Sequence, residues 1–210
     1  MKRLNVLLCA AAIVAMASPA GATQVYVGLL GGVNFADITG TDEASTRTCF
    51  SGGGLVEVDF TEQFGGRVEL LYTQKGAQQE VFDPVLGDLE STLKLSYIEI
   101  PILFVAALTH SETAAFSIFG GPSIGFNMGA DAEPSSGPSQ DLSDDVNGTE
   151  FGAVLGVEFE HIRPDMTFFG DFRFSIGATE IFEDTPSNED FKNRGFGLLV
   201  GLKIPIGSEN

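Results

Sequence analysis

The sequence predicts an all-β protein, built from eight antiparallel strands that run up and down around a closed barrel. Three observations support this prediction. Apolar residues alternate with small or charged residues at a period of two in eight successive segments, as expected of strands with two different faces. The chain contains 26 Gly, 18 Phe and no Trp, and glycine at this frequency disfavours helices. Short and long connections also take turns along the chain.

Each of the eight segments has one apolar face. In the first segment, for example, Val25, Val27 and Leu29 alternate with Tyr26 and Gly28. No convincing helical pattern separates the segments, which indicates an antiparallel β-protein. The predicted strands are 25–35, 54–60, 67–75, 96–108, 116–127, 149–160, 167–178 and 194–206.

The lengths of the connections predict how the strands are joined. Three connections are short. The other four are long, since the strand-like pattern is absent over wider stretches of the sequence there. If the two kinds take turns, all long loops leave one end of the barrel, and both chain ends lie at the other. This asymmetry is typical of outer-membrane barrels, which have short periplasmic turns and long extracellular loops. The short connections are 61–64, 109–114 and 161–165, and the long ones are about 36–50, 77–91, 128–148 and 179–193.

Residues 1–22 have the pattern of a secretory signal peptide. Lys2 and Arg3 precede an apolar run over 4–17, and a small-residue cleavage site follows. The apolar run is shorter than the roughly 20 residues that a membrane-spanning helix needs. We therefore expect export and cleavage, which leaves one β-barrel domain over 23–210.

The chain is strongly acidic. It has 11 Lys and Arg against 29 Asp and Glu, a net charge of −18. Loss of Lys2 and Arg3 with the signal peptide would leave 9 basic residues against 29 acidic ones, or −20. We expect no nucleic-acid partner, because binding to phosphate backbones needs basic patches. Only Cys49 remains after residue 22, so no intramolecular disulfide is predicted, and we assign Cys49, in the first long loop, no function.

The second face of each strand distinguishes between two kinds of eight-stranded barrel. In a soluble, lipocalin-like cup the apolar face surrounds a ligand and the other face meets water. Here the other face is mostly Gly, Ser and Asn with a few charges of both signs, unlike a water-exposed wall. The pattern favours apolar side chains on membrane hydrocarbon and small or ionic side chains in the lumen. A periplasmic carrier of an apolar ligand is the alternative.

Glu99 illustrates the difference between the two faces. It interrupts the most apolar run of the chain, SYIEIPILFVAAL (96–108), and Pro101 follows two residues later. On the inward face Glu99 needs cationic or hydroxyl partners, and the candidates are Arg67, Arg173, Lys203 and Tyr97. Because proline donates no hydrogen bond to a β-ladder, we also expect a local bulge at Pro101.

A network of charges in the lumen is the candidate site. These residues lie on the inward faces of the predicted strands and include more acids than bases, so they are expected to pair inside the barrel. The predicted set is Glu57, Asp59, Arg67, Glu69, Glu99, Glu158, Asp171, Arg173 and Lys203.

Three segments resemble a known family. They are YIEIPILFVAAL (97–108), GGPSIGFN (120–127) and FGAVLGVEFE (151–160), and they resemble the PorT-like outer-membrane β-barrel family. The resemblance covers essentially the whole mature chain and implies an eight-stranded barrel in the outer membrane. We also expect outer-membrane lipid, lipopolysaccharide and the barrel-insertion machinery as partners. Many such barrels end on an aromatic residue that the insertion machinery recognises, whereas the last strand residue here is Ile206.

Residues that carry catalysis or bind metals are sparse. His110 and His161 are the only histidines, and spacing pairs neither with a Ser or Asp, so a hydrolytic triad has no support. A lipid-modifying enzyme is therefore a weaker alternative, to be favoured only if a His lies beside a Ser or Asp at the membrane rim. The acidic segment 141–150 suggests Ca²⁺ ligands, but Val154 stands where an EF-hand needs its bidentate Glu. We predict no enzyme activity, cofactor or metal.

The sequence therefore predicts an integral outer-membrane protein. Eight strands enclose a space just wide enough for their own side chains, so a filled lumen is expected. We expect the long extracellular loops to contact an unidentified ligand, another surface or components of the envelope.

Overall fold

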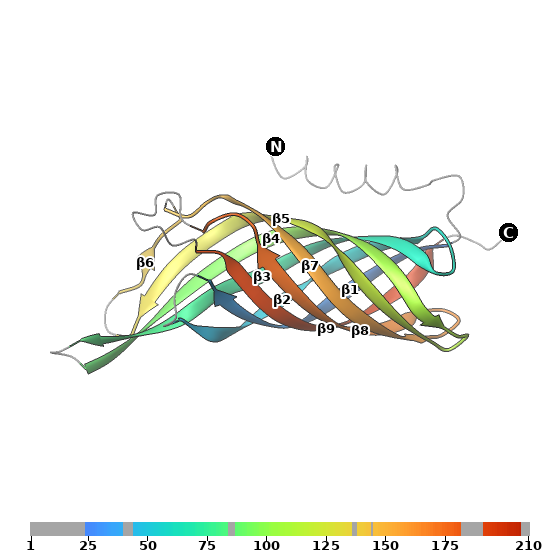
Figure 1. Cartoon of the computed structure of the whole chain (residues 1–210), viewed down its shortest axis with the longest axis horizontal. Helices are drawn as coiled ribbons and strands as arrows, with labels where there is room; N and C mark the ends of the chain where they lie inside the picture. Colours follow the sequence, from blue (N-terminus) through green and yellow to red (C-terminus); the bar gives the residue numbers. More distant parts are fainter. Residues whose placement is uncertain are drawn as a thin grey trace.

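The computed structural model describes residues 24–39, 44–83, 87–135, 138–143, 145–181 and 191–206, so the predicted signal peptide lies outside the described residues. This part of the chain forms nine strands (Figure 1). Within it, no helix is long and apolar enough to cross a membrane. The strands are β1 (Gln24–Ile38), β2 (Ala44–Asp59), β3 (Phe64–Asp83), β4 (Gly87–His110), β5 (Ala114–Pro134), β6 (Gln140–Asp141), β7 (Thr149–Ile162), β8 (Thr167–Gly177) and β9 (Asn193–Ile206).

Eight of these strands form a closed antiparallel barrel. Their order is β4-β3-β2-β1-β9-β8-β7-β5, and pairing of β4 with β5 closes the ring. The first and last strands are neighbours, with Val25 opposite Ile206. The two-residue strand β6 pairs with β5 outside the ring. Closure gives each of the eight strands two partners, so their backbone hydrogen bonds are satisfied without water. The predicted fold, a closed eight-stranded antiparallel barrel, is confirmed.

The strands continue well beyond the segments that the sequence predicts. β3, β4 and β5 contain 20, 24 and 21 residues, whereas about 9–11 tilted residues cross a bilayer. Much of the predicted loops at 36–50 and 77–91 is therefore strand. The hydrophobic alternation fades where the barrel leaves the apolar zone, but backbone pairing does not depend on it. At this end the β3–β4 hairpin projects furthest (Figure 1).

At the opposite end of the barrel, tight turns join neighbouring strands. Backbone N–H groups of Phe60, Ser111 and Arg163 donate to the carbonyl oxygens of Phe64, Ala114 and Met166. These turns join β2 to β3, β4 to β5, and β7 to β8. The structure thus has the predicted asymmetry, with short turns at one end and long strands and loops at the other.

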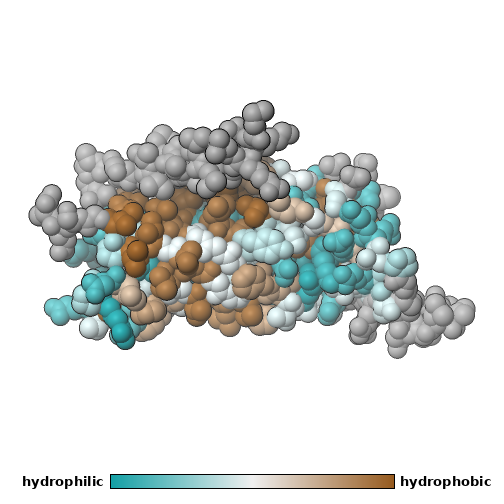
Figure 2. Space-filling model, turned by 180° about the vertical axis from the view of Figure 1, so that it is seen from behind, coloured by the Kyte–Doolittle hydropathy of each residue, from teal (hydrophilic) through white to brown (hydrophobic). Residues whose placement is uncertain are grey.

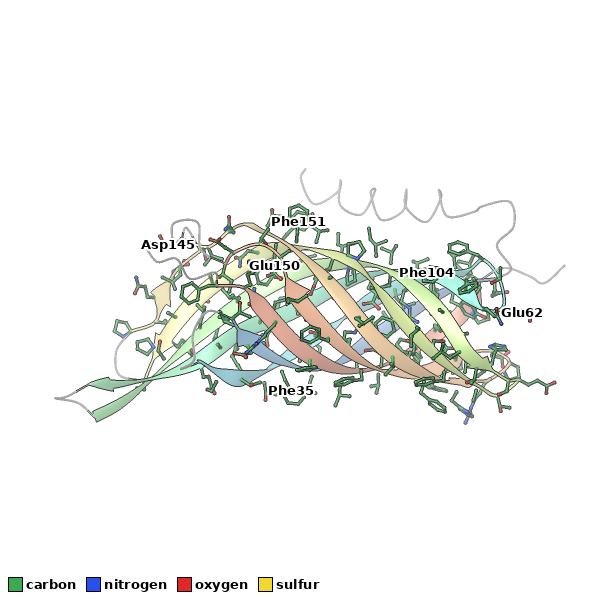
Figure 3. The ribbon with its side chains drawn as sticks, in the orientation of Figure 1. Phe35, Glu62, Phe104, Asp145, Glu150 and Phe151 are labelled. Atoms are coloured by element: carbon green, nitrogen blue, oxygen red, sulfur yellow. The ribbon has the colours of Figure 1, made fainter. Side chains whose placement is uncertain are left out.

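Apolar side chains cover the outside of the barrel, and charged side chains lie inside it. Val200 on β9 is 69% exposed, whereas Glu158 on β7 is 0% exposed. Phe104 and Phe151 project outward (Figure 3). Figure 2 shows an apolar zone on the body of the barrel and hydrophilic side chains toward the ends. In the described part of the chain this arrangement of the two faces is the reverse of that in a lipocalin-like cup, where the apolar face points inward.

The predicted bulge at Pro101 is wrong. Pro101 is buried and lies opposite Ser123 on β5 in regular register. The register between β4 and β5 shifts instead on both sides of it, between Ser96 and Tyr97 and again between Ala107 and Thr109. The irregularities of this strand pair therefore lie several residues away from the proline, near the two ends of the apolar zone.

Candidate functional site: ion pairs across the lumen

The barrel lumen contains most of the predicted charges. Strand alternation points them inward, and eight of the nine are buried, the exception being Asp59, which is half-buried at the short-turn end. The eight buried residues are Glu57, Arg67, Glu69, Glu99, Glu158, Asp171, Arg173 and Lys203.

Arg67 is the centre of the larger cluster. Its guanidinium Nη1 and Nη2 donate to the Glu158 carboxylate at 2.7 and 2.6 Å, and its Nε donates to Glu57 at 2.5 Å. Glu69 lies 3.8 Å away. The Arg67 side chain is 0% exposed. Bidentate, charge-assisted bonds of this kind offset the cost of removing a guanidinium from water.

Arg173 extends the cluster across the barrel. Its Nη1 and Nη2 donate to Glu69 at 2.6 and 3.1 Å, and its Nε and Nη2 donate to Asp171 at 2.9 and 2.6 Å. Glu69 therefore lies between two guanidinium groups, those of Arg67 and Arg173. A single connected network results.

Lys203 continues the network toward the short turns. Its ammonium group donates to Glu57 and, at 2.5 Å, to Glu160. Glu160 was not among the predicted site residues, although strand alternation also points it inward. The connected cluster thus contains the three cations Arg67, Arg173 and Lys203 and the five carboxylates Glu57, Glu69, Glu158, Glu160 and Asp171.

Aromatic rings fill the space around the guanidinium groups. Phe119 lies 5.8 Å from the Arg67 guanidinium carbon and 5.4 Å from that of Arg173, within cation–π range. The wall beside this ring is Gly156, where an added Cβ would meet a Phe119 ring atom at 2.3 Å. The same relation holds for Gly201 and Phe169, at 2.4 Å. Glycine on the inward face therefore makes room for the rings.

A second, smaller cluster lies nearer the long-loop end. The Lys75 ammonium group is 2.7 Å from Glu150 and 3.6 Å from Glu99. Asn193 Nδ2 donates to Glu150 at 2.6 Å, and the Lys75 ammonium lies 5.2 Å from the Tyr97 ring centroid. The partner of Glu99 is thus Lys75, not one of the predicted cations Arg67, Arg173 and Lys203.

The reason for this error is geometric. Alternation predicts the face on which a side chain lies, but the stagger of the strands decides which side chains meet across the lumen. Lys75 and Glu150 both point inward by alternation. Neither was selected, because nothing in the sequence places them at the height of Glu99.

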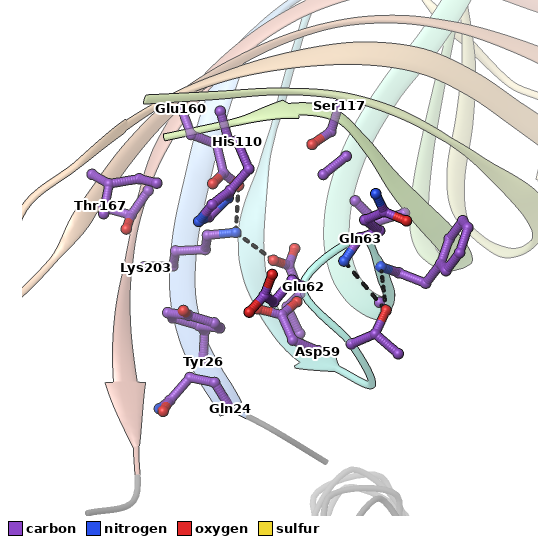
Figure 4. Close-up of a pocket in the computed structure, with 18 of the residues that line it drawn as sticks. Gln24, Tyr26, Asp59, Glu62, Gln63, His110, Ser117, Glu160, Thr167 and Lys203 are labelled. Atoms are coloured by element: carbon purple, nitrogen blue, oxygen red, sulfur yellow. Dashed lines mark hydrogen bonds and ion pairs between the residues drawn. The ribbon is translucent and has the colours of Figure 1, made fainter. Parts of the chain in front are cut away.

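The two ends of the lumen differ. At the long-loop end a cluster of buried apolar residues covers the charges, formed by Ile38, Ala77, Leu95, Tyr97, Ala130, Val146 and Ile181. At the short-turn end a cavity of about 380 Å³ opens, lined partly by Tyr26, Asp59, Glu62, His110, Ser117, Glu160 and Lys203 (Figure 4). The lumen is therefore accessible from the short-turn end and closed by side chains further in.

The cavity brings His110 close to an acid. The imidazole of His110 and the Asp59 carboxylate are near enough to interact electrostatically, and Ser117 lines the same cavity. No hydrogen bond joins His110 to a serine among the described residues. Within the same residues, no group of three or more His, Cys, Asp or Glu is placed to hold a metal ion. The His–acid proximity that would favour the lipid-modifying alternative is therefore present in this cavity, whereas the Ser–His hydrogen bond of a hydrolytic triad is not.

Cys49 lies in a different environment from the one predicted. It belongs to β2 and is buried rather than part of a loop, opposite Asn34 on β1. It is a free thiol, and its Sγ makes a weak contact of 3.7 Å with the Arg47 carbonyl oxygen.

A closed antiparallel barrel with an apolar exterior and an ionic interior defines an integral outer-membrane protein. Comparison with protein families gives the same result. Residues 18–183 match the model of the outer membrane protein β-barrel domain, and the chain belongs to this family. A search of curated protein sequences found no significant match.

Solved structures support the fold. A major outer membrane protein from Thermus thermophilus aligns with a TM-score of 0.53 and 11% identity, over 87% of this chain and 99% of that one. Neisserial surface protein A aligns with a TM-score of 0.50 and 12% identity, over 88% and 98%. OprG from Pseudomonas aeruginosa aligns with a TM-score of 0.48 and 11% identity, over 89% and 98%. At these low identities, the first two similarities show only that the fold is shared. The third has a TM-score below 0.5, and we draw no conclusion from it.

Proposed function

We propose that this outer-membrane barrel is non-enzymatic and does not conduct solutes, and that its long-loop end acts at the cell surface. There it would bind a ligand or another surface, or contribute to envelope integrity. The observation that carries this proposal is the ion-pair network around Arg67 and Arg173, which occupies the cross-section of the lumen. A solute would have to break several buried charge-assisted bonds to pass, each costly in a low-dielectric interior.

The length of the strands supports a role outside the membrane. β4 continues for 24 residues, so the barrel wall extends past the hydrocarbon at the long-loop end. Exposed polar and charged groups lie on this extension, including the Lys94–Glu133 ion pair. We propose that the partners there are lipopolysaccharide and an extracellular ligand of unknown identity. The barrel-insertion machinery would be a transient partner, and the resemblance of 97–108 supports a PorT-like subfamily.

Conductance measurements test the closed lumen. Purified protein reconstituted into planar bilayers should give no stepwise current at moderate voltage, under conditions in which a general porin conducts. As a matched variant, Arg67→Ala with Glu158→Ala removes the central pair and should raise any residual current. Porin-sized steps from the unmodified protein would contradict a filled lumen.

Protease shaving tests the orientation. In intact cells, cleavage should occur only in segments at the long-loop end, such as 135–148. The turn at 61–64 should be cut only after the outer membrane is permeabilised. Cleavage at 61–64 in intact cells would invert the topology and remove the basis of the surface role.

The enzyme alternative has its own test. A hydrolytic role for the cavity would require the His110 imidazole, so His110→Ala should then change the lipopolysaccharide or phospholipid profile of cells. We expect the lipid profiles of wild type and His110→Ala to be identical, with Glu62→Ala as a control at the same cavity. A difference confined to His110→Ala would favour a lipid-modifying enzyme.

A further inference from the structure

A small cavity lined by six polar and four apolar residues lies inside the barrel between the two charge clusters. Its volume is about 20 Å³, above the roughly 10–15 Å³ that one water molecule needs. Its polar lining comes from strands β1, β2, β3, β4 and β8. The polar residues are Asn34, Ser51, Thr73, Glu99, Arg173 and Ser175.

The side chain of Thr73, which lines this cavity, indicates that the cavity holds a ligand. Thr73 is 4% exposed, and its Oγ1 has no hydrogen-bond partner among the described protein atoms. A buried hydroxyl without a partner destabilises the folded state, so native proteins rarely leave one unsatisfied. The hydroxyl lines a cavity of the right size, which indicates that a small ligand completes its hydrogen bonding.

The hydrogen-bond donors and acceptors that line the cavity indicate which ligand fits it. Glu99 only accepts hydrogen bonds when ionised, Arg173 only donates, and the Thr73 hydroxyl does both. A monatomic cation would meet the positive guanidinium of Arg173 at close range. Water, in contrast, donates to a carboxylate and accepts from a guanidinium or a hydroxyl at the same time.

We propose that this cavity is a binding site for one ordered water molecule that bridges Thr73, Glu99 and Arg173. Glu99 belongs to the Lys75 cluster, and Arg173 belongs to the Arg67 cluster. The water therefore joins two separate ion-pair clusters into one hydrogen-bonded system. The inference goes beyond the closed-lumen proposal, because the water site exists whether or not the protein conducts.

The direct test is a crystal structure of the wild-type protein at a resolution that shows ordered waters. We expect a density peak within hydrogen-bonding distance of Thr73 Oγ1 and of the Glu99 carboxylate or the Arg173 guanidinium. Crystals grown with choline in place of sodium should show the same peak. Absence of the peak, or a peak that requires sodium, would overturn the proposal.

Variants of Thr73 provide a second test by urea unfolding. Thr73→Val removes the hydroxyl and should lower the ratio of folded to unfolded protein about tenfold, whereas Thr73→Ser should retain nearly all stability. The crystal structure of Thr73→Val should lack the peak. A Thr73→Val protein that keeps the peak and full stability would show that Thr73 does not hold the water. If Thr73→Val does not fold, the wild-type density alone decides.

Discussion

Arg173 on β8 and Glu69 on β3 lie on opposite walls of the barrel and are joined across the lumen by two hydrogen bonds of 2.6 and 3.1 Å. Three strands separate β8 from β3 in either direction around the ring. The pair therefore connects parts of the wall that share no backbone hydrogen bond. Because both groups are buried, each stabilises the fold only while the other is present.

Removing Arg173 should destabilise the barrel strongly. Arg173→Met leaves Glu69 and Asp171 buried with fewer cationic partners, so we expect a loss of about 3–5 kcal/mol in the free energy of unfolding. The measurement is urea unfolding in lipid vesicles, followed by circular dichroism and by the heat-modifiable mobility of the folded barrel on gels.

The control for Arg173→Met is an ion pair at the surface. Lys94 and Glu133 are 37% and 47% exposed, so water screens their attraction. Lys94→Met should therefore change the free energy of unfolding by about 0–1 kcal/mol. Equal effects of the two substitutions would show that the lumen pairs do not hold the barrel together.

The free-energy cost of placing a charge on the outer face of the barrel should depend on the depth of that position in the membrane. Val200 lies in the middle of β9 and is 69% exposed on the apolar face. Val200→Lys should cost about 2–4 kcal/mol in lipid, because a charge near the bilayer midplane is poorly solvated. Leu108→Lys, on an exposed residue near the short turns, should cost about 0–1 kcal/mol. Similar costs at both positions would mean that the membrane does not surround this zone.

The sequence predicted the faces of the strands because side-chain direction alternates with every residue. Glu57, Arg67 and Glu158 follow this rule, and the structure places all three inside the barrel. The alternation also predicted eight strands, since each apolar segment crosses the membrane once. The direction of a side chain depends only on its position along its own strand, so it can be predicted from a single sequence.

The contacts across the lumen could not be predicted in the same way. The pairing of Lys75 with Glu99 and of Lys203 with Glu160 depends on how far each strand is staggered against the next. The continuation of β3 and β4 beyond the apolar zone was missed for a related reason. Backbone hydrogen bonds sustain these strands where hydrophobic alternation has ended.

Gly76 should tolerate no side chain. It has a φ of +119°, and an added Cβ would lie 2.0 Å from the Leu93 carbonyl oxygen. Gly76→Ala should lower the free energy of unfolding by about 1–3 kcal/mol through backbone strain and steric overlap. Gly129 is the matched control in the same part of the barrel, since an added Cβ there meets no atom within 4 Å. Urea unfolding of both variants should therefore separate them, and a neutral Gly76→Ala would contradict the strand geometry at this position.

Cys49 should be protected from reagents in the folded barrel. It is buried in β2, whereas Ser45, four residues earlier in the same strand, is exposed toward the long-loop end. A membrane-impermeant maleimide should leave Cys49 unlabelled in intact cells and should label it after denaturation. In a Cys49→Ser background, Ser45→Cys should be labelled from outside the cell. Rapid labelling of Cys49 in intact cells would place it in an exposed loop, as its sequence context alone suggests. Labelling of neither position would put this end of the barrel on the periplasmic side.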